Sequence, residues 1–415
     1  MLKVIIFGTS NSVMRNGWVA GLSSNSKIEV KNISIGRSPS LMHIANIIKY
    51  KEELKQVDLI LLEHYVNDIN FYIGNFEDNY YIKLIEDLLA FISTLNKPII
   101  SVMLPIFNIQ KKISYASVDI LKKLYSIYNI MYIDFNNFSE FKFDYHNDEI
   151  HLKHYIAFFL GSELSKILYE YKFPKFDAQK LQSQPYKIFE CHDIVSSSSN
   201  YTENDIVKIS NSLTKYEYIQ LIHDIDISSF KDYELIAIAY HNCENINHIF
   251  QISTEKESIS YKTVGVQYFV ETLNKPIRID SSTTISVPKN NFADIKPLMN
   301  RNDQTDFTNK FSGVYLSYLL FKLKNNHISV STKQMQIKND ITFLMEESVK
   351  KIPIMFDELI VKNSNDKVDI IREAALAVEK INLKLAYDLM MIAHQLRPNG
   401  PFIKIKLDEY RMQLS

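Results

Sequence analysis

The chain has 415 residues, 46% of them hydrophobic and 23% charged, and its formal net charge is −1. This composition is typical of globular proteins, and the balanced charge argues against a nucleic-acid partner, which would need a basic excess. Two cysteines are too few for a disulfide framework, and no apolar run is long enough for a membrane span or a signal peptide. We therefore predict a cytoplasmic protein of several domains.

The first part of the chain, residues 1–175, is predicted to alternate strands and helices. Short apolar runs predict five buried strands, over residues 3–7, 29–35, 58–64, 98–104 and 130–135. Helical spacing predicts helices near Trp18 and over residues 41–53, 79–95, 117–128 and 152–171. Such alternation predicts an α/β domain with a parallel sheet covered on both faces, whose ligands bind at the carboxyl ends of the strands.

A second domain is predicted over residues 186–330, where the apolar runs are short, β-branched and aromatic. This pattern is typical of an antiparallel sandwich or half-barrel. The aromatic residues are expected to form its core, with sugar stacking as the alternative. Residues 288–312 are predicted to form a long loop, and residues 314–323 fit a strand and a helix equally well.

The last part, residues 340–415, is predicted to be helical. Residues 367–398 match one tetratricopeptide unit in part, through small and large residues at the expected positions and Pro398. A plain helical hairpin is the alternative. Because one repeat cannot bury its own apolar face, these helices are expected to pack on a neighbour or on a protein partner.

Polar residues that carry chemistry follow the predicted strands. Ser10 follows the first strand, Gly36 the second and Asn67 the third, while Asp148 and His151 precede the last helix. The carboxyl ends of parallel strands meet at one edge of a sheet, so these residues are expected to share one pocket.

These segments resemble the SGNH (GDSL-like) hydrolase family over about residues 1–172. Gly8-Thr9-Ser10 stands where the family has Gly-Asp-Ser, and Gly36 matches the glycine of the second block. Asn67-Asp68 matches the Asn-Asp of the third block, and Asp148-x-x-His151 matches the fifth. The sequence departs from the family at Thr9, which replaces a non-catalytic Asp, and at Tyr65, which replaces a glycine. The change at Tyr65 is expected to alter the pocket wall or the oxyanion geometry.

The resemblance implies a flavodoxin-like three-layer fold and a serine acyl-enzyme mechanism. Ser10 would be the nucleophile, His151 its base, and Asp148 the group that orients the imidazole. The oxyanion would be held by the backbone N–H groups of Ser10 and Gly36 and by the side-chain amide of Asn67.

Other interpretations of these residues remain open. Ser10 is also a favoured helix N-cap, Asn67 a favoured Asx-turn residue and Gly36 a turn residue. His146 and His154 are the rival bases.

Asp144 is the rival orienting group for the histidine. His241, Cys243 and His248 lack a fourth metal ligand at suitable spacing, so no metal is expected. Cys191-His192 suggests thiol catalysis, but its strand-like context favours a packed cysteine.

The resemblance implies acyl-ester chemistry, commonly on carbohydrate O-acyl groups. We predict a carbohydrate O-acetyltransferase of capsule or lipopolysaccharide assembly, with no bound cofactor and with acetyl-CoA as the acyl donor. A carbohydrate O-acetyl esterase is the first alternative, because water can accept the same acyl group. A non-catalytic glycan-binding scaffold is the second.

Overall fold

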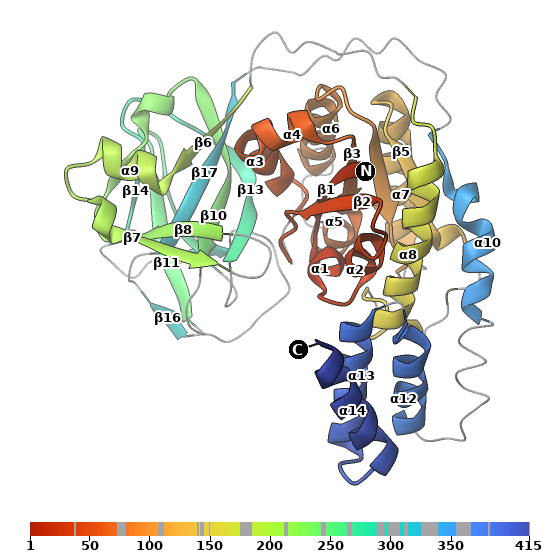
Figure 1. The fold of residues 1–415 in the computed structure, drawn as a ribbon. Helices are drawn as coiled ribbons and strands as arrows, with labels where there is room; N and C mark the ends of the chain where they lie inside the picture. The colour runs from red at the N-terminus through yellow and green to blue at the C-terminus, as the bar shows by residue number, and fades with distance from the viewer. Residues whose placement is uncertain are drawn as a thin grey trace.

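The computed structural model has an α/β region, a β-rich region and a group of C-terminal helices (Figure 1). The structure describes residues 1–36, 39–72, 80–106, 112–138, 141, 145–148, 150–174, 185–210, 215–241, 246–263, 268–288, 295–297, 308–310, 314–324, 339–353, 367–380 and 382–414. Among these residues, no helix combines the length and the apolar character needed to cross a membrane.

The α/β region is built on a five-stranded parallel sheet with the strand order β2-β1-β3-β4-β5. Its strands are β1 (Leu2–Gly8), β2 (Ile28–Asn32), β3 (Leu59–Glu63), β4 (Ile99–Met103) and β5 (Met131–Asp134). All five lie within the predicted runs or within a residue of them. The three inner strands are apolar without alternation because helices cover both faces of the sheet.

The two helix layers bury opposite side chains of β1, β3, β4 and β5, so the predicted flavodoxin-like three-layer fold is confirmed. One layer contains α3 (Met42–Lys49), α4 (Lys51–Gln56), α6 (Tyr80–Ser93) and α7 (Lys112–Ile127). The other contains α2 (Trp18–Ser23) and α8 (His154–Glu170). A Cβ atom on Gly21 of α2 would lie 1.9 Å from the carbonyl oxygen of Phe158, so glycine is needed where these helices cross.

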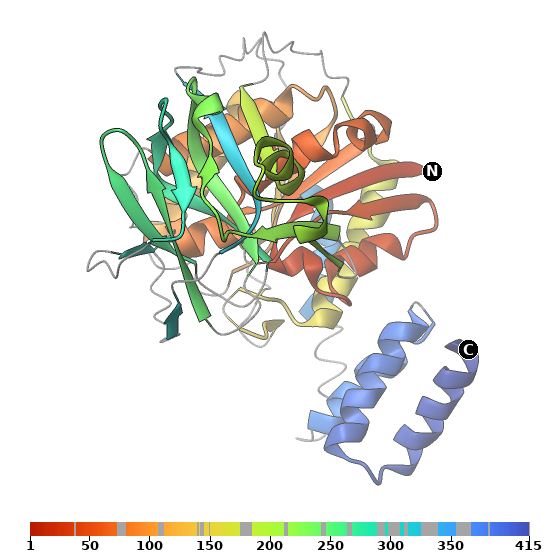
Figure 2. The ribbon, with the colours of Figure 1, turned by 90° about the vertical axis from the view of Figure 1, so that its left-hand side faces the viewer.

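The β-rich region has two sheets that enclose a common apolar core, as a sandwich does (Figure 2). The first contains β6 (Tyr186–Glu190), β7 (Ile206–Ser210), β8 (Lys215–Gln220), β10 (Tyr233–His241), β13 (Tyr268–Arg278) and β17 (Tyr315–Leu323). The second contains β9 (Ile225–Asp226), β11 (Ile246–Ser253), β12 (Ser258–Lys262), β14 (Thr284–Ser286), β15 (Ile295–Pro297) and β16 (Thr308–Lys310). Most strand pairs are antiparallel, as predicted, whereas β11–β16 and β12–β15 are parallel.

Two expectations for this region need correction. Cys191 does not lie in a strand but begins helix α9 (Cys191–Ser197), where Glu190 and Asp193 cap the helix reciprocally. The predicted loop over residues 288–312 contains the short strands β15 and β16, and most of its other residues lie outside the described ones. Residues 314–323, which fitted two structures equally well, form strand β17.

The first sheet of the β-rich region packs against the α3–α6 layer of the α/β region. Tyr186, Ile236, Tyr318 and Leu320 share one apolar core with that layer. Lys322 of β17, whose side chain is 11% exposed, forms an ion pair with the buried Asp87 of α6. The two regions are therefore joined by a packed interface.

The C-terminal part returns to the other face of the α/β region. Asn339 accepts a hydrogen bond from the backbone N–H of Tyr132 in β5 (2.8 Å), and residues 341–352 pack beside α8 through η5 (Thr342–Met345) and α10 (Glu346–Val349). The helices α12 (Lys367–Val378), α13 (Leu383–Leu396) and α14 (Pro401–Leu414) form a further apolar cluster, which includes Phe158 of α8. Their tetratricopeptide character and their role in partner binding stay predictions.

Candidate active site

Three of the predicted site residues form one chain of hydrogen bonds. Ser10 is the first residue of the short helix α1 (Ser10–Val13), directly after β1. Its Oγ lies 2.9 Å from Nε2 of His151, and Nδ1 of His151 lies 2.8 Å from Oδ2 of Asp148. With the ring proton on Nδ1, the imidazole donates to the carboxylate and accepts from the serine hydroxyl. This is the arrangement that removes a proton from an attacking serine.

The loop that carries Asp148 and His151 is fixed by its own hydrogen bonds. Oδ1 of Asp148 accepts the backbone N–H groups of Ile150 and His151, each at 2.9 Å. Partial burial acts to raise the pKa of Asp148, but these bonds and the one from the imidazole outweigh it and lower the pKa. The carboxyl group therefore stays ionised and available to orient the ring.

The two other oxyanion candidates, Gly36 and Asn67, lie at the same edge of the sheet. A Cβ atom on Gly36 would lie 3.9 Å from Cα of Ser10, so the two backbones are neighbours. Asn67 lies in the first turn of α5 (Tyr65–Tyr72), which follows β3, and it is buried. The predicted residues are thus gathered on one edge, as the positions of the strand ends indicate.

The rival residues do not take part in this chain of hydrogen bonds. Nε2 of the buried His146 lies 3.2 Å from the carbonyl oxygen of Pro105, so the imidazole is engaged away from Ser10. His154 is the exposed first residue of α8. Asp144 lies outside the described residues.

Residues 9–12 form a turn around the nucleophile, which we call the Ser10 turn. Two residues that the sequence analysis did not single out support it. Nδ2 of Asn11 donates to the carbonyl oxygen of Ile150 at 3.1 Å, which ties the Ser10 turn to the histidine loop. The buried Glu63, at the end of β3, accepts hydrogen bonds from Thr9 and Ser12. Glu63 could have been recognised in the sequence as a carboxylate at the end of an otherwise apolar strand, because a buried carboxylate needs hydrogen-bond partners.

A second carboxylate, that of Asp68, holds the segment that follows Gly36. Its Oδ1 accepts the backbone N–H of Ser40 at 3.0 Å, and its Oδ2 lies 3.1 Å from Nδ1 of His64. Nε2 of His64 lies 2.9 Å from the hydroxyl of Tyr125. This hydrogen-bond network is buried at Asp68, His64 and Tyr125. It therefore holds Ser40, four residues after Gly36, in a fixed position relative to α5.

Tyr65, which stands where the resembled family has a glycine, is accommodated inside the α/β region. The ring is fully buried, its hydroxyl donates to the carbonyl oxygen of Leu104, and it accepts a hydrogen bond from Nδ2 of Asn136 at 2.7 Å. Tyr65 therefore packs beneath the edge of the sheet, joining the ends of β3, β4 and β5. Its side chain is engaged inside the α/β region.

The remaining candidates from the sequence are placed elsewhere. Cys191 is buried, and burial raises the pKa of its thiol to about 11, which does not suit a nucleophile. His241 stacks on Tyr218 with the ring centroids 5.0 Å apart, while Cys243 lies outside the described residues. No cluster of three or more possible metal ligands occurs among the residues that the structure describes.

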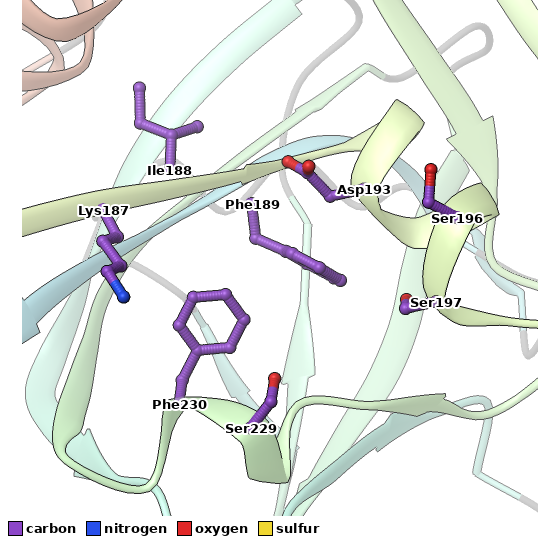
Figure 3. Close-up of a pocket in the computed structure, with 8 residues that line it drawn as sticks. All are labelled: Lys187, Ile188, Phe189, Asp193, Ser196, Ser197, Ser229 and Phe230. Carbon is purple, nitrogen blue, oxygen red and sulfur yellow. The ribbon is translucent and has the colours of Figure 1, made fainter.

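A depression of about 340 Å³ lies on the β-rich region, between β6, α9 and η4 (Ser228–Phe230) (Figure 3). Phe189 and Phe230 line it, with ring centroids 5.2 Å apart. Lys187 and Asp193 also line it. None of the predicted site residues lines this depression.

Comparison with protein-family models gives no match, and comparison with curated proteins gives none either. Among solved structures, the chain is similar to a psychrotrophic esterase from Pseudoalteromonas sp. (19% identity, TM-score 0.34, 41% of this chain and 100% of that chain). It is also similar to a member of the lipolytic protein G-D-S-L family from Veillonella parvula (20%, 0.33, 41% and 98%). An acetylxylan esterase from Geobacillus stearothermophilus, solved as a catalytic mutant, is a third (16%, 0.32, 42% and 95%).

Proposed function

We propose that this chain is a serine acyl-ester enzyme of the SGNH type, with Ser10 as nucleophile, His151 as base and Asp148 as the orienting carboxylate. The observation that carries the proposal is the continuous chain of hydrogen bonds from Ser10 through His151 to Asp148. The three side chains come from positions 10 and 148–151 of the sequence. The mechanism requires that these three side chains lie within hydrogen-bonding distance of one another. A histidine on the surface or a serine that only caps a helix would not require this arrangement.

The first half-reaction follows from these positions. The Ser10 hydroxyl attacks the ester carbonyl while His151 accepts its proton at Nε2. The tetrahedral oxyanion is held by the N–H groups of Ser10 and Gly36 and by the Asn67 amide. His151 then donates the proton to the leaving atom, which is the oxygen of an ester or the sulfur of a thioester such as acetyl-CoA, and an acyl-Ser10 intermediate remains. An acceptor hydroxyl, activated by His151 in turn, takes the acyl group and restores Ser10.

Within this class we propose transfer of an acetyl group to a sugar hydroxyl of a bacterial surface polysaccharide, capsule or lipopolysaccharide, with acetyl-CoA as donor. A two-substrate reaction needs a surface for the acceptor as well as the acyl site. We assign the acceptor surface to the β-rich region, which is joined to the α/β region by a packed interface. Its depression, lined by Phe230, Lys187 and Asp193, offers an aromatic ring and polar groups that could contact a sugar.

The alternative is hydrolysis, in which water accepts the acyl group, so that the chain would be a carbohydrate O-acetyl esterase. The deciding experiment is mass spectrometry of candidate polysaccharides incubated with the protein, with and without acetyl-CoA. A gain of acetyl mass that depends on acetyl-CoA supports transfer. Loss of acetyl mass from an acetylated polymer supports hydrolysis and overturns the transfer proposal.

The second alternative is a glycan-binding scaffold that performs no chemistry. A fluorophosphonate probe tests it, because such probes form a bond with an activated serine. We expect the wild-type chain to be labelled and Ser10→Ala to remain unlabelled. Equal labelling of both chains, or of neither, would contradict an activated Ser10.

A further inference from the structure

We propose that Glu63 is the positioning residue of the nucleophile: its carboxylate holds the turn on both sides of Ser10 in the geometry that His151 requires. This inference rests on the proposed function of Ser10. Glu63 ends strand β3 and lies opposite Gly8 in the register of the parallel β1–β3 pair. Its side chain is therefore placed at the carboxyl end of β1, where the Ser10 turn begins.

The carboxylate binds the residues that precede and follow the nucleophile. Oε2 of Glu63 accepts the backbone N–H of Thr9 at 3.0 Å and the hydroxyl of Ser12 at 2.8 Å. Oε1 accepts the hydroxyl of Thr9 at 3.0 Å. Ser10 thus lies between two residues that are fastened to the same side chain, and rotation of the turn would break several hydrogen bonds together.

The site is closed tightly around this carboxylate. Glu63 and Thr9 are fully buried, and Ser12 is 1% exposed, so no bulk water substitutes for a lost bond. A Cβ atom on Gly8 would lie 2.1 Å from Oγ of Ser12, so glycine is required for Ser12 to reach the carboxylate. The first glycine of the Gly8-Thr9-Ser10 segment therefore serves the same anchor.

The ionised form of Glu63 suits these contacts best. A carboxylate is a pure acceptor, and its charged hydrogen bonds are stronger than neutral ones. Burial raises the pKa of Glu63 to about 7, against the opposing effect of the bonds from Thr9 and Ser12. Among the residues that the structure describes, no charged group contributes to this shift. A titratable side chain coupled to Glu63 is the buried Tyr65, whose own pKa is raised by burial, so it stays neutral.

Glutamine at this position is a close mimic of the protonated acid. Its amide oxygen can accept from Thr9 and Ser12 in place of Oε2, and its NH₂ group can donate to the Thr9 hydroxyl in place of a carboxylic O–H. Glu63→Gln should therefore fold and should behave at every pH as wild type behaves when Glu63 is protonated. Glu53→Gln on α4 is a matched control, because Glu53 is exposed and pairs with Lys31.

The test measures kcat and KM for p-nitrophenyl acetate between pH 5.5 and 9 in wild type, Glu63→Gln and Glu53→Gln. We expect Glu63→Gln to lower kcat at pH 8 by about 10-fold or more, with KM changed by less than about threefold. The wild-type profile should contain an ionisation near pH 7 that Glu63→Gln lacks, and Glu53→Gln should match wild type. A Glu63→Gln profile that coincides with that of wild type would overturn the proposal.

Hydrogen exchange separates this proposal from the proposed function. Peptides that cover the Ser10 turn should exchange faster at pH 8 in Glu63→Gln than in wild type, whereas Glu53→Gln should leave them unchanged. Equal exchange in all three chains contradicts the anchoring role, whatever the activity. If Ser10→Ala hydrolyses the ester as fast as wild type, the proposed function fails, and the exchange data still decide whether Glu63 holds the turn.

Discussion

The central sheet of the α/β region and the first sheet of the β-rich region are each covered on both faces, but by different partners. The α/β sheet is covered by helices of its own region and, beside α8, by residues 341–352. The β-rich sheet is covered on one face by the second sheet of its region and on the other by the α3–α6 layer. This layer therefore packs against both sheets within one continuous apolar core.

The candidate active site and the contact that holds the two regions together lie in different places. The triad and its anchors lie at one edge of the α/β sheet, in turns and helix starts. The joint between the regions lies on the face of α3 and α6 that points away from that sheet, and it contains the Lys322–Asp87 pair. Substitutions of the triad residues should thus change activity with little change in stability, and substitutions at the joint should do the reverse.

The largest expected effect is that of Ser10→Ala on activity. Loss of the nucleophile should lower kcat/KM for an acetyl ester by about 10³-fold or more. The free energy of unfolding should stay close to that of wild type, because Ser10 is partly exposed at the start of a short helix. Ester-hydrolysis kinetics and chemical denaturation measure the two quantities. Activity within a few-fold of wild type would refute the nucleophile.

Asn67→Ala should have the next largest effect on activity. Because the amide is assigned to the oxyanion, kcat should fall by about 10²–10³-fold with a smaller change in KM. Steady-state kinetics on the same ester measure both constants. A change confined to KM would instead assign Asn67 to substrate binding.

The joint is tested by Lys322→Met. This substitution leaves Asp87 buried without its cation, so the free energy of unfolding should fall by about 3–4 kcal/mol. Burial already raises the pKa of Asp87 against the effect of Lys322, so the loss should be greater at high pH, where the carboxyl group must ionise. Chemical denaturation at pH 6 and pH 8 measures this loss.

Two further variants make the joint experiment specific. Lys31→Met removes an exposed pair with Glu53 and should change stability by no more than about 1 kcal/mol. The double variant Lys322→Met/Asp87→Leu removes both charges of the pair and should recover most of the lost stability. If Lys322→Met alone matches Lys31→Met, the ion pair does not hold the regions together.

The same comparison explains what could be predicted from the sequence. The α/β strands are short and close to their helices in sequence, and β3, β4 and β5 are wholly buried, so apolar runs located them within a few residues. Residues 315–323 are equally apolar because β17 is buried on both faces, and periodicity could not distinguish a strand from a helix there. The partner of one of those faces, α6, lies more than 200 residues earlier in the chain.

The site divides in a similar way. Ser10, Asp148 and His151 could be proposed because their types and order match a known pattern, and the structure brings their side chains together. Glu63 and Asn11 were missed because their importance depends on contacts across 54 and 139 positions. No local pattern reports such contacts, although an acidic residue ending a buried strand was a usable signal.

The smallest expected effect is the contribution of Glu63 to the pH dependence of the free energy of unfolding. It tests whether the residues at the edge of the α/β sheet lower stability in favour of function. The pKa of Glu63 is raised from 4.5 to about 7, so the native state binds this proton more tightly than the unfolded state does. The resulting stabilisation is complete below about pH 4.5 and is lost as the pH rises through 7. A shift of this size corresponds to on the order of 3 kcal/mol.

Glu63→Gln cannot titrate, so it isolates this contribution. The free energy of unfolding of wild type minus that of Glu63→Gln should fall by roughly 3 kcal/mol between pH 4.5 and 8.5, because all other groups cancel in the difference. Chemical denaturation across this range measures it, and a difference that does not vary with pH would contradict a buried, titrating Glu63. If it does vary, the form of Glu63 that holds Ser10 best is also the form that destabilises the fold. A stability–activity conflict of this kind is expected at a catalytic edge and not at the joint between the regions.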